Sequence, residues 1–269
     1  MMISGLCFAI VHAAVKAVSR IPAHEIVVAR AIISIVLTWL ALKKVGISPW
    51  GQNRPMLVFR GVAGTAALLL YFHTIQTMPL ATAVTIQYLH PILTVILASF
   101  FLREPARLGQ WLCFAVSFIG VILVKGFDTR ITPLDLGLGI ASAGCSAIAY
   151  NLIRALRDED HALVVMFYLP LVSFVVVGPW TAFHFVMPQG VEWPFLLVIG
   201  FFTQIAQYFM TRAYQSDTAA NISNLNYLGI IYASAIGFVF FDETVTALAS
   251  IGILTIVSSA IISARLSRR

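Results

Sequence analysis

The chain has 269 residues, of which 60% are hydrophobic and only 10% are charged. Soluble domains carry roughly 25% charged residues, so a chain this apolar cannot cover its surface in water. Its apolar residues form long continuous runs, whereas a transmembrane barrel would alternate apolar and polar residues in segments of about ten. Because a backbone in lipid must satisfy its hydrogen bonds internally, the composition predicts an all-α, polytopic membrane protein.

The charge and the cysteines argue against several other classes of protein. The formal net charge of +6 is interpreted as basic loops on the cytoplasmic face of a membrane rather than as a nucleic-acid-binding surface. Cys7, Cys113 and Cys145 fall in separate apolar segments, without the paired spacing of a disulfide framework or a metal site. We therefore expect no metal, no cofactor and no nucleic acid, and a lipid bilayer as the surroundings of the chain.

Ten segments are long and apolar enough to cross a bilayer as helices, which takes about 20 residues each. In chain order, the predicted spans are 2–19, 25–42, 56–77, 80–102, 107–124, 133–154, 162–183, 192–212, 218–240 and 246–264. An even number of spans puts both termini on one side, and twelve of the 17 basic residues, Arg60 among them, are then counted on that side. The positive-inside rule therefore predicts cytoplasmic termini. We expect a multi-pass protein of the plasma membrane, which in a bacterium is the inner membrane.

The first two spans each carry a basic side chain close to one end. Ionisable residues within spans are functional candidates by default, which makes Lys16 and Arg30 candidates for a charge or coupling role. Both could instead extend to the membrane interface, as long basic side chains near span ends do. His90 is a third coupling candidate, because a histidine that titrates near neutral pH can relay protons, the candidate coupling ion. A neutral, hydrogen-bonded histidine is an equal alternative.

The span 80–102 contains polar residues near the bilayer midplane, in the stretch "TIQYLHPILTV". Gln87, Tyr88 and His90 are predicted to line a cavity. Pro91 cannot donate a hydrogen bond to the carbonyl of Gln87, so a kink and a hinge are predicted there. Interhelical hydrogen bonding is the alternative interpretation, and such bonds average only about 0.6 kcal/mol.

Polar side chains mark four other spans as candidates to line the same cavity. Several Gln and Asn side chains, each with two donors and an acceptor, are hard to explain by packing alone. The candidates are His73 and Gln76 in the third span, Tyr150 in the sixth, Gln204, Gln207 and Tyr208 in the eighth, and Asn221, Asn224 and Tyr227 in the ninth.

The two halves of the chain echo each other at a nearly constant offset. "YFHT" near the end of the third span recurs as "YFMT" near the end of the eighth, and "FFLRE" ending at Glu104 recurs as "VFFDE" ending at Glu243. We therefore predict two repeats of five helices, 1–130 and 131–269. Because five is odd, the second repeat must insert upside down. Inverted repeats are typical of secondary transporters, which bind substrate near the midplane between them.

The chain also resembles the EamA family of the drug/metabolite transporter superfamily. The resemblance rests on Pro91, Phe100 to Glu104, Gly109 and Gly120 in the first half, and on Phe240 to Glu243 and Gly252 in the second. It implies that the first four helices of each half surround the cavity. It also implies a proton-coupled or facilitative carrier, and many members export amino acids and other metabolites. One departure is that Gly229 and Ile230 stand where the first half has Pro91, so a proline kink is not duplicated.

These observations favour a secondary transporter that moves a small organic, amino-acid-like or zwitterionic metabolite by alternating access, with export as the expected direction. An intramembrane enzyme is the first alternative, but no predicted span carries a carboxylate pair, a metal motif such as H-E-x-x-H, or a serine with a base in reach. A membrane receptor or regulator is the second alternative, and the short loops leave little surface for a soluble partner. A homodimer is left open.

Overall fold

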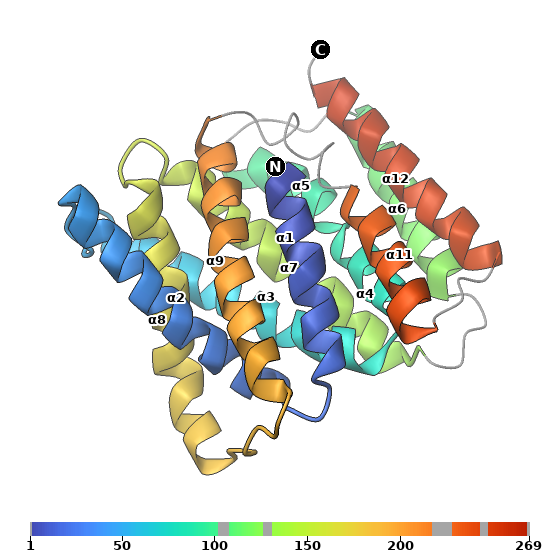
Figure 1. Ribbon diagram of the computed structural model, residues 1–269. Coiled ribbons are helices and arrows are strands. Elements are labelled where there is room, and N and C mark those ends of the chain that lie inside the picture. Colours follow the sequence, from blue (N-terminus) through green and yellow to red (C-terminus); the bar gives the residue numbers. More distant parts are fainter. Residues whose placement is uncertain (1, 102–107, 126–130, 217–227, 243–246, 268–269) are drawn as a thin grey trace.

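The computed structural model describes residues 2–101, 108–125, 131–216, 228–242 and 247–267 (Figure 1). These ranges are helical and contain no strand, which confirms the predicted all-α class. In chain order the helices are α1 (Met2–Ala17), α2 (Ala23–Val45), α3 (Arg54–Thr77), α4 (Leu80–Gln87), α5 (His90–Phe101), α6 (Leu108–Lys125), α7 (Pro133–Ala155), α8 (Ala162–Phe183), α9 (Glu192–Ser216), α11 (Leu228–Phe241) and α12 (Ala247–Ser267). By length and composition, α2, α3, α7, α8 and α9 are long and apolar enough to cross a membrane.

Most helix boundaries lie within a few residues of the predicted spans, and three spans differ. The span predicted at 80–102 is divided into α4 and α5, and the eighth span continues to Ser216. Of the ninth predicted span, 218–240, the structure describes only the part in α11. The candidates Asn221, Asn224 and Tyr227 therefore lie outside the described residues.

The break between α4 and α5 lies at Tyr88 and Leu89, just before Pro91. The amide of Leu89 donates to the carbonyl of Ile86 at 3.0 Å, a three-residue spacing typical of a 3₁₀ turn. Pro91 has no N–H with which to continue the helical bonding to Gln87. The interruption lies where the sequence predicts a kink.

The helices form a bundle in which the two halves of the chain pack on each other (Figure 1). At one edge α6 packs on α12, at the other α2 packs on α8, and α1, α3, α7 and α9 lie between them. Contacts also join α3 to α7, α1 to α9, α5 to α7 and α1 to α11. The centre of the molecule is therefore built from helices of both halves.

Close packing of α3 on α8 depends on two glycines. A Cβ added to Gly61 would lie 2.6 Å from Cγ2 of Val172, and one added to Gly64 would lie 2.6 Å from Cδ1 of Leu169. At Gly61 the added carbon would also lie 2.8 Å from Cβ of Val172, so a larger residue would push α3 away from α8, whereas at Gly64 the end of the Leu169 side chain would have to turn aside. Small residues allow helix backbones to approach closely in membranes, and here they bring the second half against the first.

The two ends of the bundle carry different parts of the chain. α1 begins and α12 ends at the upper end of Figure 1, which we call the terminal end. The α1–α2 and α8–α9 loops lie at the lower end, which we call the far end (Figure 1). Where α7 begins, Thr132 caps the helix by accepting a hydrogen bond from the amide of Asp135 at 3.0 Å.

Candidate functional site

A cavity lies at the centre of the bundle, with a water-accessible volume of ≈ 100 Å³. Its walls come from helices of both halves, and the lining side chains are Gly5, Phe8, Val11, His12, Arg30, Leu68, Tyr71, Phe72, Gln87, Tyr88, His90, Tyr150, Thr203, Gln207, Met210 and Tyr214. The cavity thus brings together several of the residues singled out in the sequence. These are Arg30, Gln87, Tyr88, His90, Tyr150 and Gln207.

Gln87 ties the break between α4 and α5 to α7. Its Nε2 donates to Oγ of Ser146 at 2.7 Å, and its Oε1 accepts from Oγ of Ser142 at 3.0 Å. The hydroxyl of Ser142 also lies 2.8 Å from the carbonyl of Ala67 in α3. Gln87 therefore lines the cavity and also makes the interhelical hydrogen bonds of the alternative interpretation.

Aromatic rings form much of the cavity wall. The rings of His90 and Tyr150 have centroids 4.8 Å apart, and Tyr150 stacks on Tyr214 with centroids 5.0 Å apart. A separate contact joins His12 to Tyr71, whose hydroxyl lies 3.4 Å from Nδ1 of the histidine. Because a tyrosine combines an apolar ring with a polar tip, this wall can contact both the apolar and the polar parts of a solute.

Arg30 lines the cavity from α2 and is only 3% exposed. Its Nε has no hydrogen-bond partner, and it makes no ion pair within the described part of the chain. The alternative that this side chain extends to the membrane interface is therefore wrong for this structure. A buried guanidinium group faces the cavity instead.

Arg60 on α3 is a second buried guanidinium. It is counted among the basic residues of the predicted cytoplasmic side, and it lies in the second turn of α3, where it is 2% exposed. Its Nε and Nη1 have no hydrogen-bond partner among the described residues. It is close enough to Arg30 for the two positive charges to repel each other. Counting basic residues by side cannot distinguish a loop residue from one that is buried a short way into a helix.

Helix α9 presents a different face to the cavity from the one predicted. Gln204 donates from Nε2 to Oγ1 of Thr38 on α2 at 2.7 Å, and Tyr208 is 38% exposed. The α9 side chains that line the cavity are Thr203, Gln207, Met210 and Tyr214. Thr203 and Tyr214 were not singled out in the sequence, although they stand four residues before and seven after Gln207, the spacing of one helix face.

Three other predicted residues lie at the far end, outside the cavity. Nζ of Lys16 donates at 2.8 Å to the carbonyl of Met78, the C-cap residue of α3. Basic side chains commonly bind the carbonyls at a helix C-terminus. Nε2 of Gln76 donates to the carbonyl of Ile21 at 2.8 Å. Nε2 of His73 lies 3.9 Å from Oδ1 of Asp135. In this conformation these three side chains join helix ends and loops.

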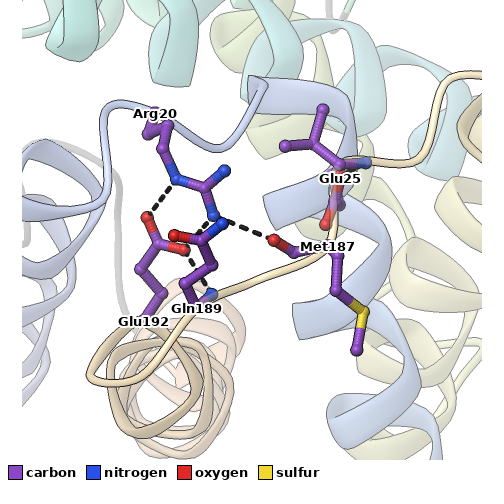
Figure 2. Close-up of polar contacts among 6 residues, drawn as sticks. Arg20, Glu25, Met187, Gln189 and Glu192 are labelled. Carbon is purple, nitrogen blue, oxygen red and sulfur yellow. Dashed lines mark hydrogen bonds and ion pairs between the residues drawn. The ribbon is translucent and has the colours of Figure 1, made fainter.

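A polar network joins the α1–α2 loop to the α8–α9 loop at the far end (Figure 2). Nε of Arg20 donates to Oε1 of Glu192 at 2.8 Å, and Nη2 donates to Oε2 of the same carboxylate. Nη2 also donates to the carbonyl of Met187 at 2.9 Å, and Oε2 of Glu25 accepts from the amide of Val186 at 2.9 Å. The hydrogen bond to Glu192 raises the pKa of Arg20, so its charge is retained. We call these five residues the far-end network.

The chemistry available in the cavity is that of binding. Within the described ranges, no group of three His, Cys, Asp or Glu side chains could hold a metal ion. The wall offers hydroxyl and amide groups, aromatic faces and one buried guanidinium. Such a lining can hold a small polar solute by hydrogen bonds, charge and ring contacts.

Comparison with known proteins finds one family and several transporters to which the chain is similar. The model of the EamA-like transporter family matches residues 1–126 and 135–265. The chain is 32% identical over 267 residues to the pseudopaline exporter CntI of Pseudomonas aeruginosa strain UCBPP-PA14, covering 98% of this chain and 94% of that protein. It is 29% identical to the human solute carrier family 35 member G1, over 96% of this chain and 76% of that protein. The S-adenosylmethionine uptake transporter of Rickettsia felis is 24% identical, over 71% of this chain and 65% of that protein.

The fold also occurs in a protein of known crystal structure. The two superpose with a TM-score of 0.73 and 18% sequence identity, covering 99% of this chain and 96% of the other. At that identity the likeness concerns the fold alone.

Proposed function

This chain belongs to the EamA-like transporter family and is a membrane transporter rather than an enzyme; from that premise we propose that it is a secondary carrier for a small polar metabolite. It works by alternating access, in which two inverted five-helix halves, 1–130 and 131–269, expose a shared site to either side in turn. The observation that carries this proposal is the central cavity, whose walls come from helices of both halves.

The helix contacts support two related halves. We pair each helix of the first half with one of the second: α1 with α7, α2 with α8, α3 with α9, α5 with α11 and α6 with α12. When each helix is replaced by its counterpart, the following contacts map onto contacts that are also present. The α3–α7 contact becomes α9–α1, the α3–α8 contact becomes α9–α2, and the α5–α7 contact becomes α11–α1. The α2–α8 and α6–α12 contacts map onto themselves. This is the pattern expected of a pseudo-two-fold axis through the cavity.

The positions of the lining residues support a cavity that extends from the terminal end of the bundle past mid-depth. The lining begins at Gly5 on α1, includes Tyr150 near the end of α7, and extends to Tyr214 on α9. All three lie toward the terminal end of their helices, whereas the far-end network closes the other end. With both termini in the cytoplasm of a bacterial cell, the cavity would face inward, and the direction we propose is export.

A zwitterionic or amino-acid-like solute fits the lining, with Gln207 among its contacts. The test is uptake of a pooled, labelled metabolite library into proteoliposomes, with and without an inward proton gradient. We expect gradient-dependent accumulation of at least one small polar solute. Gln207→Ala should lower that flux about tenfold, because a lost hydrogen bond to a charged group costs about 1.5–3 kcal/mol.

The controls separate the transporter from its coupling and from its site. Gln215→Ala, on the same helix but outside the cavity, should keep the wild-type flux. Equilibration without accumulation would identify a facilitator and remove the proton role of His90. Unchanged flux in Gln207→Ala, at equal protein levels, would contradict the site assignment.

A further inference from the structure

Arg30 is a positive charge inside the predicted second span, without a countercharge among the residues that the structure describes. Only 3% of its surface is exposed, and it lines the cavity. Its Nε makes no hydrogen bond, and the described residues offer it no ion pair. A buried charge of this kind is unfavourable unless a partner of opposite charge joins it.

Arg60 adds to this positive potential. It is also buried, its Nε and Nη1 have no partner among the described atoms, and its charge repels that of Arg30. Within the described ranges no carboxylate pairs with either guanidinium: Glu192, for example, binds Arg20 at the far end, and Asp135 accepts from Thr77 at 2.8 Å. The cavity is thus positive, and an anion that enters it would relieve the repulsion between the two guanidinium groups.

The shape of the guanidinium group indicates which anion. Its planar set of N–H donors matches the two oxygens of a carboxylate, with which it forms paired hydrogen bonds. Gln207 supplies a complementary group, because its Oε1 is buried against the same cavity and has no partner in the described structure. An unpaired acceptor and an unpaired cation on the wall of one cavity suit a solute that carries both a carboxylate and an N–H group.

We propose that Arg30 binds the carboxylate of the transported solute, so that substrates of this carrier are carboxylic acids or amino-acid-like zwitterions. Solutes that lack a carboxylate are excluded because they leave the buried guanidinium group unpaired. The proposal rests on the transport function proposed above and assigns the substrate class of that same site.

The test compares the binding of carboxylates and of the corresponding amides, in which an uncharged amide replaces the carboxylate, to the purified protein. Thermal unfolding in detergent is followed with alanine and alaninamide, phenylalanine and phenylalaninamide, succinate and succinamide, and benzoate and benzamide. A ligand that binds only the folded state raises the Tm. We expect at least one carboxylate to raise it by several degrees while the matching amide does not.

Two variants assign the effect to this side chain. Arg30→Gln should lose the shift, whereas Lys44→Gln, which removes one exposed charge from the same helix, should keep it. If Arg30→Gln does not fold, Arg30→Lys retains the charge without the paired donors and should reduce the shift. The proposal is overturned if no carboxylate in the panel stabilises the wild type, if an amide does so equally well, or if the shift survives in the folded Arg30 variants.

Flux measurements distinguish this proposal from the transport function. Flux of uncharged or cationic solutes in proteoliposomes, with no stabilisation by any carboxylate, would overturn the role of Arg30 and leave transport established. Stabilisation by a carboxylate that depends on Arg30, without flux of that solute, would support the binding site and contradict transport of that solute.

Discussion

Polar side chains in the centre of this protein differ in whether other residues already satisfy them. Gln87 makes hydrogen bonds to Ser142 and Ser146, and Gln204 donates to Thr38. Gln207 and Arg30, in contrast, each have a buried atom without a partner among the described residues. Satisfied groups hold helices together, and groups without partners are available to a solute, so the two kinds should respond differently to substitution.

The pair formed by Gln87 and Ser146 should act as a structural link. Gln87→Leu and Ser146→Ala should each destabilise the protein by about 1 kcal/mol, because each leaves a buried partner unpaired. Making the second change in the presence of the first should cost less, with a coupling energy of about 0.6 kcal/mol. Thermal unfolding of the single and double variants measures this coupling. The hydroxyl of Thr255 donates to the carbonyl of Ile251 within α12, so Thr255→Val should show no coupling to Gln87→Leu.

At the scale of the element, a proline alone does not divide a helix. α8 contains Pro170 and Pro179 and continues through both. The span that contains Pro91 is divided, and there the preceding residues form a 3₁₀ turn and Gln87 is bonded to α7. Mid-helix 3₁₀ turns often mark hinges. The proline thus leaves one hydrogen bond open, and the tertiary contacts set how the chain bends.

Replacing Pro91 tests whether this break acts as a hinge. Pro91→Ala restores an N–H that can bond to the carbonyl of Gln87. Because Pro91 lies in the first turn of α5, where proline is tolerated, the Tm should change little. The flux should fall several-fold, since a continuous helix bends less readily. Pro170→Ala, in a helix that is already continuous, is the matched control and should leave the flux near the wild-type value. Equal flux in the two variants would rule out a hinge at Pro91.

Hydropathy predicted the helical class and most helix boundaries because the cost of exposing backbone in lipid applies along the whole length of a span. The cavity was harder to predict because facing depends on neighbours. Helix α9 packs on both α1 and α2, so its inward-facing residues have different surroundings. Gln204 donates to Thr38 on α2, whereas Gln207 lines the cavity. The depth of Arg60 depends on how α3 packs, which charge counting along the sequence does not include.

At the scale of the whole molecule, the far-end network is a contact between the halves that the proposed alternating access would have to break. Arg20 and Glu25 belong to the first half, and Met187 and Glu192 to the second (Figure 2). The network crosses the far end of the bundle, so we expect it to close the cavity to solutes arriving from that end while it holds. Weakening the network should therefore favour the conformation that is open at the far end.

Glu192→Gln should increase access to the cavity from the far end. The reporter is Leu68→Cys, a half-buried lining position, in a chain whose Cys7, Cys113 and Cys145 are replaced by alanine. Losing the charge of Glu192 weakens both hydrogen bonds from Arg20, so the conformation that is open at the far end gains population. A membrane-impermeant maleimide added outside should then label the introduced cysteine several-fold faster. The control is Asp158→Asn, which breaks an exposed ion pair between the neighbouring residues Arg157 and Asp158. This pair does not connect the two halves, so the labelling rate should stay unchanged. Equal labelling rates in the two variants would show that the network does not hold the far end closed.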